Sequence, residues 1–114
     1  NGHLGFNEPG SAFDSRTRVI DLAESTIEDN ARFFGGASDV PTQAVTQGLG
    51  TIREARELIV IAMGEGKADA VAASIAGEPS IDMPGSAVQN HPNVVWCLDE
   101  AAAARLVADG VATH

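Results

Sequence analysis

Leu58-Ile59-Val60-Ile61-Ala62-Met63 is the stretch of sequence that decides the fold. It is continuously apolar and rich in β-branched residues, and Gly64 closes it. This pattern is typical of a parallel strand that is buried on both faces. A helical stretch to about Ala76 follows, and then a second apolar run from Val94 to Leu98. Strand, helix and strand in this order predict a βαβ unit with a right-handed crossover.

The flanking sequence adds helices and two weaker strand candidates. Asp99 is expected to cap an Ala-rich carboxyl-terminal helix. Upstream, Ser25 and Glu28 have the spacing of a capping box at the start of another helix. The strand candidates cover residues 17–22 and 41–47. The sequence therefore predicts an α/β fold, a three-layer, Rossmann-like arrangement in which helices cover both faces of a mainly parallel sheet.

Composition limits the classes of function. The chain has 114 residues, the size of one domain, with a net charge of −9 and a pI near 4.5. Its 7 basic residues are scattered among 16 acidic ones, which argues against nucleic-acid binding because counterion release needs clustered Lys and Arg. No apolar run is long enough to span a membrane. Cys97 is the single cysteine, so we expect an inert thiol in a buried strand, no internal disulfide and a cytoplasmic protein.

The opening residues, NGHLGFNEPG, hold most of the candidate chemistry. Glycines and a proline surround an imidazole, a carboxylate and side-chain amides, so the backbone must turn here. Such a loop can bring His3 and Glu8 together, and a carboxylate beside an imidazole is a common acid–base unit. A loop of this kind normally follows a strand. The sequence is therefore expected to begin inside a domain.

Lys67 and Arg32 are candidate anion ligands, and each also has a simpler explanation. Lys67 follows Gly64 and Gly66 at the predicted start of a helix, where a positive charge is unfavourable unless an anion binds. Spacing alone slightly favours an ordinary solvated lysine, because the loop lacks the pattern of a phosphate-binding P-loop. An exposed helical ion pair with Glu28 or Asp29 explains Arg32 more simply, and from spacing alone this explanation is preferred.

The remaining histidines and the hydroxyl residues form no recognisable catalytic pattern. His91 precedes Pro92 between a predicted helix and a strand, and we expect it to be structural. The histidine spacing does not fit a metal site, and a single cysteine gives no further support, so no metal is expected. The sequence contains no Gly-x-Ser-x-Gly motif, which leaves a serine hydrolase with little support.

The chain resembles the glucosamine-6-phosphate deaminase family along essentially its whole length, in the segments NGHLGFNEPG, SRTRVIDL, NARFF, VPTQAVTQGLGTI, GEGKADAV and NHPNVVWCLDEAAA. The resemblance implies that residues 1–114 are the carboxyl-terminal portion of a single α/β domain. It also implies a hydrolase of amino-sugar catabolism that converts glucosamine 6-phosphate and water into fructose 6-phosphate and ammonia without a cofactor. The family includes monomers and hexamers, so a homo-oligomer is one of the alternatives.

The same resemblance implies roles for individual residues. His3 is the acid–base group that moves a proton at the ring oxygen, and Glu8 orients and charges its imidazole. Arg32 and Lys67 bind the substrate phosphate, which reverses the interpretation from spacing alone. Asn1 stands where many members have Asp and adds no negative charge. We predict that Asn1→Asp raises the pKa that governs ring opening; an unchanged pH–rate profile of the complete enzyme would contradict this.

Two further expectations concern regulation and completeness. Ser11 and Arg18 match positions of the site at which N-acetylglucosamine 6-phosphate activates some members, but Ile20 and Asp21 replace polar or basic residues there. We therefore do not expect activation by that effector. In the family, the carboxylate that moves the proton between C2 and C1 belongs to the amino-terminal half. The 114 residues alone are accordingly expected to lack deaminase activity.

Three alternatives to the deaminase remain. A 6-phosphogluconolactonase shares the fold and an Asp-Gly-His loop, although the continuation from Phe6 to Pro9 fits the deaminase better. A non-catalytic sugar-phosphate sensor of the same fold is disfavoured by the presence of His3 and Glu8. The third alternative is a stable folded piece without a function of its own. Sequence upstream of the opening loop would separate the enzyme from the sensor: a strand, a Ser/Gly-rich loop and an Asp-bearing segment would indicate the enzyme, and a helix-turn-helix would favour the sensor.

Overall fold

The structure, a computed structural model, describes residues 1–111. Its strands form two separate pairs within these residues. β1 (Arg18–Asp21) pairs antiparallel with β2 (Gln43–Thr46), and β3 (Leu58–Ala62) pairs parallel with β4 (Val94–Leu98). The α-helices are α1 (Glu24–Asn30), α2 (Leu49–Arg53), α3 (Ala68–Ala76) and α4 (Glu100–Ala108), and the short 3₁₀ helices are η1 (Ala31–Phe33), η2 (Ala37–Asp39), η3 (Glu65–Lys67) and η4 (Pro84–Val88).

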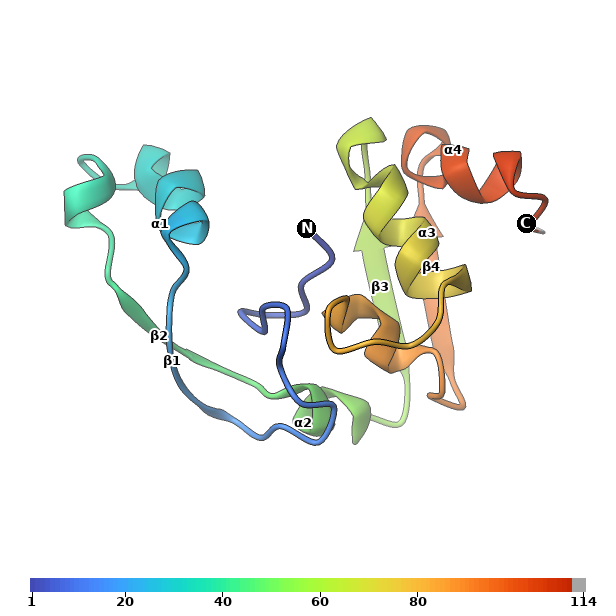
Figure 1. The fold of residues 1–114 in the computed structure, drawn as a ribbon, viewed down its shortest axis with the longest axis horizontal. Coiled ribbons are helices and arrows are strands. Elements are labelled where there is room, and N and C mark those ends of the chain that lie inside the picture. The colour runs from blue at the N-terminus through green and yellow to red at the C-terminus, as the bar shows by residue number, and fades with distance from the viewer. Residues whose placement is uncertain (112–114) are drawn as a thin grey trace.

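The opening loop lies between the two strand pairs. Figure 1 shows β1, β2 and α1 on one side of it, and β3 and β4 with α3 and α4 on the other. The short helix α2 lies at the base of the molecule and joins the two sides (Figure 1). This arrangement confirms the predicted α/β class. Among the described residues, however, there is no single larger parallel sheet.

The predicted βαβ unit is present with nearly the expected boundaries. The parallel register runs from Leu58 opposite Val94 to Ala62 opposite Leu98. α3 packs against α4 and η4, and this contact contains much of the buried apolar core. The buried apolar residues of these elements are Ala68, Val71, Ala87, Val88, Ala102, Ala103 and Leu106. None of the described helices is long and apolar enough to cross a membrane.

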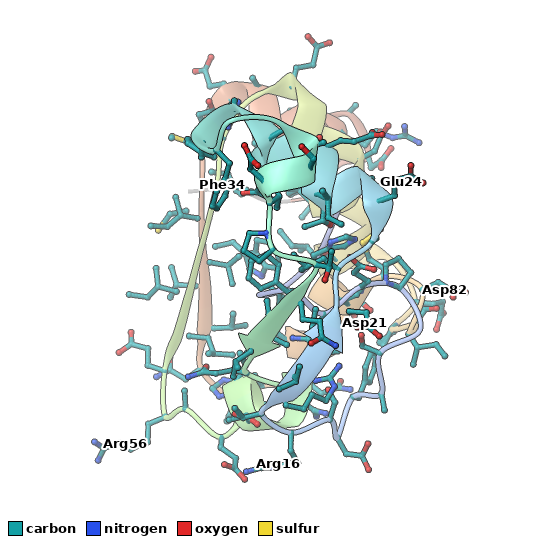
Figure 2. All side chains as sticks on the ribbon, turned by 90° about the vertical axis from the view of Figure 1, so that its left-hand side faces the viewer. Arg16, Asp21, Glu24, Phe34, Arg56 and Asp82 are labelled. Atoms are coloured by element: carbon teal, nitrogen blue, oxygen red, sulfur yellow. The ribbon has the colours of Figure 1, made fainter. Side chains whose placement is uncertain are left out.

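The expectation that β3 and β4 are buried on both faces is not met in this structure. Burial alternates along both strands, and Ile59, Ile61 and Val95 are 63%, 69% and 47% exposed. Because successive side chains of a strand point to opposite faces, this alternation means that only one face is covered. Side chains along these strands project away from the body of the molecule in Figure 2. Cys97 lies on the open face, so the prediction of a buried thiol is wrong.

The predicted capping box on α1 is also wrong. The helix begins at Glu24, and its N-cap residue is Ala23 rather than Ser25. A carboxylate from the opening loop binds at this end of the helix instead: Glu8 Oε1 accepts from the backbone N–H of the N-cap residue Ala23 at 3.1 Å. Asp99, by contrast, caps α4 as predicted, accepting from Ala102 N at 2.8 Å.

Candidate active site

A cavity of about 420 Å³ lies where the opening loop meets α1, α3 and the β3–β4 pair. Its lining includes the side chains of Asn1, His3, Thr26 and Lys67. The apolar part of the wall comes from the strand pair, where Trp96 is among the lining residues. The predicted acid–base histidine and the predicted phosphate lysine therefore share one cavity, although they are far apart in the sequence.

Gly2, the residue before His3, fixes the backbone at the start of the opening loop. Gly2 has a φ of +73°, in the left-handed region that glycine adopts most easily. Its carbonyl oxygen accepts from the N–H of Gly85 at 2.7 Å. A β-carbon at Gly2 would contact Met83 Sδ, so the flexible end of that half-buried side chain would have to move aside. The left-handed φ is therefore the main reason that position 2 favours glycine.

A tight turn follows His3. The N–H of Asn7 donates to Leu4 O at 3.2 Å, and Gly5 within the turn has a φ of +59°. The N–H of Phe6 donates to Thr46 Oγ1 at 3.0 Å, which joins the turn to β2. His3 therefore lies immediately before a short, hydrogen-bonded turn, and Glu8 lies immediately after it.

Partial burial is the main influence on the imidazole of His3. Burial lowers the pKa of His3 below its ordinary value of 6.5, and the positive charge of Lys67 acts in the same direction. The carboxylate of Glu8 raises that pKa and so opposes these effects. The imidazole is therefore mainly neutral at pH 7, the state in which it can accept a proton.

Glu8 is held at the amino-terminal end of α1. Its Oε1 accepts from Thr26 Oγ1 and from Ala23 N, each at 3.1 Å. Within residues 1–111 no hydrogen bond joins Glu8 to His3, so the carboxylate acts on the imidazole through its charge rather than by direct contact. No local pattern singles out Thr26, because its partner lies 18 residues away.

The two predicted phosphate ligands are not brought together. Lys67 ends η3, immediately before α3, and its exposed side chain lines the cavity. Arg32 is exposed on η1, and its guanidinium lies 4.7 Å from the centre of the Phe33 ring. Arg32 is not among the residues that line the cavity, and the helical ion pair with Glu28 suggested by spacing is not formed in the described chain.

Ser11 and Arg18 line a second cavity of about 420 Å³ on the other side of Glu8. Ser11 Oγ donates to Glu8 O at 2.7 Å, and Arg18 Nη1 donates to Asn7 Oδ1 at 3.0 Å. These two residues are therefore close to the opening loop. Ile20 also lines this cavity, so part of its wall is apolar.

Asn7 is the main residue that the sequence interpretation missed. Its side chain is fully buried, and Nδ2 donates to Leu4 O and to Gln47 O at 2.7 Å each. The only signal in the sequence was a side-chain amide in a glycine-rich turn, which many exposed loops also have. His91 is structural, as predicted: its Nδ1 accepts from Asn93 N at 3.0 Å, so its Nε2 donates to Ala55 O at 2.6 Å.

No metal centre can be built from residues 1–111, where no three His, Cys, Asp or Glu side chains are grouped as ligands. What the arrangement offers is a partly buried neutral imidazole, a nearby carboxylate and an ammonium group around one cavity. Such a set can move a proton on a substrate whose anionic group binds near Lys67.

Comparison with known proteins gives a consistent result. The family model for glucosamine-6-phosphate isomerases and 6-phosphogluconolactonase matches residues 17–96. A glucosamine-6-phosphate deaminase of Rhodopirellula baltica is 58% identical over 106 residues, which are 93% of this chain and 42% of that protein. The deaminase of Leuconostoc citreum is 53% identical over 106 residues, again 93% of this chain and 46% of the relative.

A solved structure of a monomeric glucosamine-6-phosphate deaminase superposes with a TM-score of 0.86 at 42% identity. The match covers 92% of this chain and 44% of that one. The chain thus spans less than half of the length of the relatives that it matches.

Proposed function

Because this chain belongs to the family of glucosamine-6-phosphate isomerases and 6-phosphogluconolactonases, we propose that it is the carboxyl-terminal portion of a cytoplasmic glucosamine-6-phosphate deaminase. The reaction converts glucosamine 6-phosphate and water into fructose 6-phosphate and ammonia. The observation that best supports this proposal is the cavity shared by His3 and Lys67, next to a loop that also bears Glu8. The relatives described above, which are 58% and 53% identical, are both named as deaminases, and this favours a deaminase over a lactonase.

In this proposal His3 exchanges a proton at the ring oxygen of the sugar and so opens the ring. Its lowered pKa keeps the imidazole neutral near pH 7, ready to accept a proton. Glu8 then stabilises the imidazolium that forms, because its negative charge raises the pKa of His3. Thr26 and the backbone of Ala23 hold the carboxylate in place.

Lys67 binds the phosphate at the amino-terminal end of α3, where the partial positive charge of the helix adds to that of its ammonium. Arg32 is the second proposed ligand, and it would have to leave the Phe33 ring to reach the phosphate. An exposed cation–π contact is worth only about 0.5–1 kcal/mol. A hydrogen bond to a charged group contributes about 1.5–3 kcal/mol. The exchange is therefore favourable once a phosphate is bound.

We also propose that the rest of the domain covers the open face of β3 and β4 and completes a three-layer arrangement with helices on both faces of the sheet. The large exposed residues Ile59, Ile61 and Val95 support this, because contiguous apolar surface usually marks an interface. Cys97 offers a direct test, since its side chain lies on that face. Its thiol should react readily with a maleimide in the 114-residue chain and slowly in the complete protein. Equal labelling rates would count against the three-layer arrangement.

The activity itself is tested by comparing the complete protein with the 114-residue chain. Fructose 6-phosphate and ammonia should form in equal amounts with the complete protein. The 114-residue chain should form neither product, because the proton-transfer carboxylate belongs to the other half of the family domain. Hydrolysis of 6-phosphogluconolactone is measured in parallel, and activity on the lactone alone would replace the proposed function. Sugar-phosphate binding without turnover would favour a sensor.

A further inference from the structure

Asn7 lies at the centre of the opening loop, and every hydrogen-bonding group of its side chain is in use. Nδ2 donates to Leu4 O and to Gln47 O, each at 2.7 Å. Oδ1 accepts from Arg18 Nη1 at 3.0 Å. The residue is 0% exposed, so water cannot replace these contacts. A buried polar group in such a position strongly restrains the segments that it joins.

The partners of Asn7 come from three separate parts of the chain. Leu4 belongs to the turn itself, Arg18 begins β1, and Gln47 follows the last residue of β2. The amide thus fixes the turn to the end of one strand and the start of another. His3 is the residue before this turn and Glu8 is the residue after it.

The chemistry of these contacts requires a carboxamide. Two carbonyl oxygens need two donors, and the guanidinium needs an acceptor, a combination that only Asn and Gln side chains provide. An aspartate of the same shape would keep the contact with Arg18 but would turn a carboxylate oxygen towards Leu4 O and Gln47 O. Both contacts would then be lost, and two buried acceptors would face a negative charge.

The rest of the turn provides little packing of its own. Phe6 is 39% exposed and Gly5 has no side chain. One other side-chain contact, from Phe6 N to Thr46 Oγ1, links the turn to β2. Gly2 and Glu8 are anchored on either side of the turn, but without the amide the turn between them would keep only this one side-chain link to the strands.

We propose that Asn7 is a positioning residue, which fixes His3 and Glu8 in their relative places for catalysis through its contacts with Leu4, Gln47 and Arg18. This inference rests on the proposed deaminase function. Asn7 itself does not line the cavity, and it acts only through the loop.

The test uses Asn7→Asp and Asn7→Ser in the complete protein, with Asn93→Asp as the control. Asn93 is an exposed asparagine on the loop before β4, so its exchange should change kcat by less than about twofold. Asn7→Asp should lower kcat by on the order of 100-fold, because small misplacements of catalytic groups have effects of this size. KM should change much less, since Lys67 lies outside the loop. Asn7→Ser keeps one donor and should be intermediate.

Two measurements on the same proteins do not depend on the reaction. Hydrogen exchange of the Phe6 and Asn7 amides should become at least about tenfold faster in Asn7→Asp while the β3–β4 amides keep their protection. The titration of His3, followed by NMR, should move towards an ordinary histidine in Asn7→Ser, which adds no charge. If Asn7→Asp does not fold, Asn7→Ser decides the result in each measurement.

The outcomes separate this inference from the proposed function. An active wild type whose Asn7 variants keep kcat within about twofold of normal would overturn the positioning role. An equal loss of stability in all regions, with normal kcat at a temperature where the variants are folded, would also overturn it. If the wild type has no deaminase activity, the proposed function fails. Unchanged amide exchange and His3 titration would then reject the restraint itself.

Discussion

The close passage of Gly2 past Met83 gives a prediction whose magnitude follows from the structure. Gly2→Ala places a methyl group at a residue with a φ of +73° and directly against Met83 Sδ. The left-handed conformation alone costs a non-glycine residue about 1–2 kcal/mol. The methyl group also forces the Met83 thioether aside, and because this is the flexible end of a half-buried side chain the cost is about 0.5–1.5 kcal/mol. We therefore expect a total loss of about 1.5–3.5 kcal/mol in the free energy of unfolding.

Two other glycines separate the two contributions. Gly10 has a φ of +95°, but a β-carbon there would meet nothing within 4 Å, so Gly10→Ala should show the conformational cost alone. Gly66 has neither a left-handed φ nor a neighbour within 4 Å. Gly66→Ala should therefore raise stability by about 0.4–1 kcal/mol through the unfolded state. The expected order of stability is Gly66→Ala, wild type, Gly10→Ala and then Gly2→Ala.

Urea denaturation of the complete protein, followed by far-UV circular dichroism, measures these differences, provided that the m-value is the same for all variants. Met83→Ala in the Gly2→Ala background removes the contact and should recover about 0.5–1.5 kcal/mol relative to the sum of the single changes. Additive effects of Gly2→Ala and Met83→Ala would refute the steric part of the reasoning. A stable Gly10→Ala variant would refute the conformational part.

The remaining predictions concern single side chains. Thr26→Val removes the hydroxyl that donates to Glu8. It should lower kcat about 10- to 100-fold, since hydrogen bonds to charged groups contribute about 1.5–3 kcal/mol. Thr26→Ser should keep most of the activity, and equal rates for the two variants would exclude a role of the Thr26 hydroxyl in holding Glu8. Lys67→Met should raise KM for the sugar phosphate about tenfold or more, whereas Arg56→Met, at the opposite end of β3, should leave it unchanged in the same steady-state assay. Backbone hydrogen bonds, of which the one from Ala102 is the strongest influence, lower the pKa of Asp99. The carboxylate therefore stabilises the folded protein above the unfolded pKa of about 4, and this stabilisation is lost as the pH falls through the folded pKa. Asp99→Asn should remove this acid-dependent loss, which urea midpoints at neutral and acidic pH would reveal.

Local sequence pattern was sufficient for the elements whose structure depends on nearby residues. β3, α3, β4 and α4 lie where the apolar periodicity and the Asp99 cap predicted them. The start of α1 was predicted wrongly because the carboxylate that binds there belongs to Glu8, which lies 15 residues before the N-cap residue Ala23. A pattern within the helix cannot reveal a partner supplied by another segment. The capping box at Ser25 was a plausible local solution that a distant carboxylate replaced.

The same distinction applies to the candidate site. The residue types and the glycine turn of the opening loop are sufficient by themselves to indicate acid–base chemistry. Membership of the deaminase family confirmed the resemblance, whereas the individual roles of His3, Glu8, Lys67 and Arg32 stay predictions. Asn7 could not be found from pattern alone, because its importance lies in burial and in contacts up to 40 residues apart.

Asp99 links the start of α4 to the turn at Gly64, so we expect these two segments to open together. Its carboxylate accepts from Ala102 N in α4 and from Gly64 N, at 3.0 Å, in the turn that leads to Lys67. Fraying of α4 would therefore release the Gly64 turn as well, because one side chain belongs to both structures. Amides at Gly64 and at the start of α4 should exchange with solvent as one cooperative unit. If Lys67 binds the substrate phosphate as proposed, damage near the carboxyl-terminal helix should weaken that binding without touching the cavity.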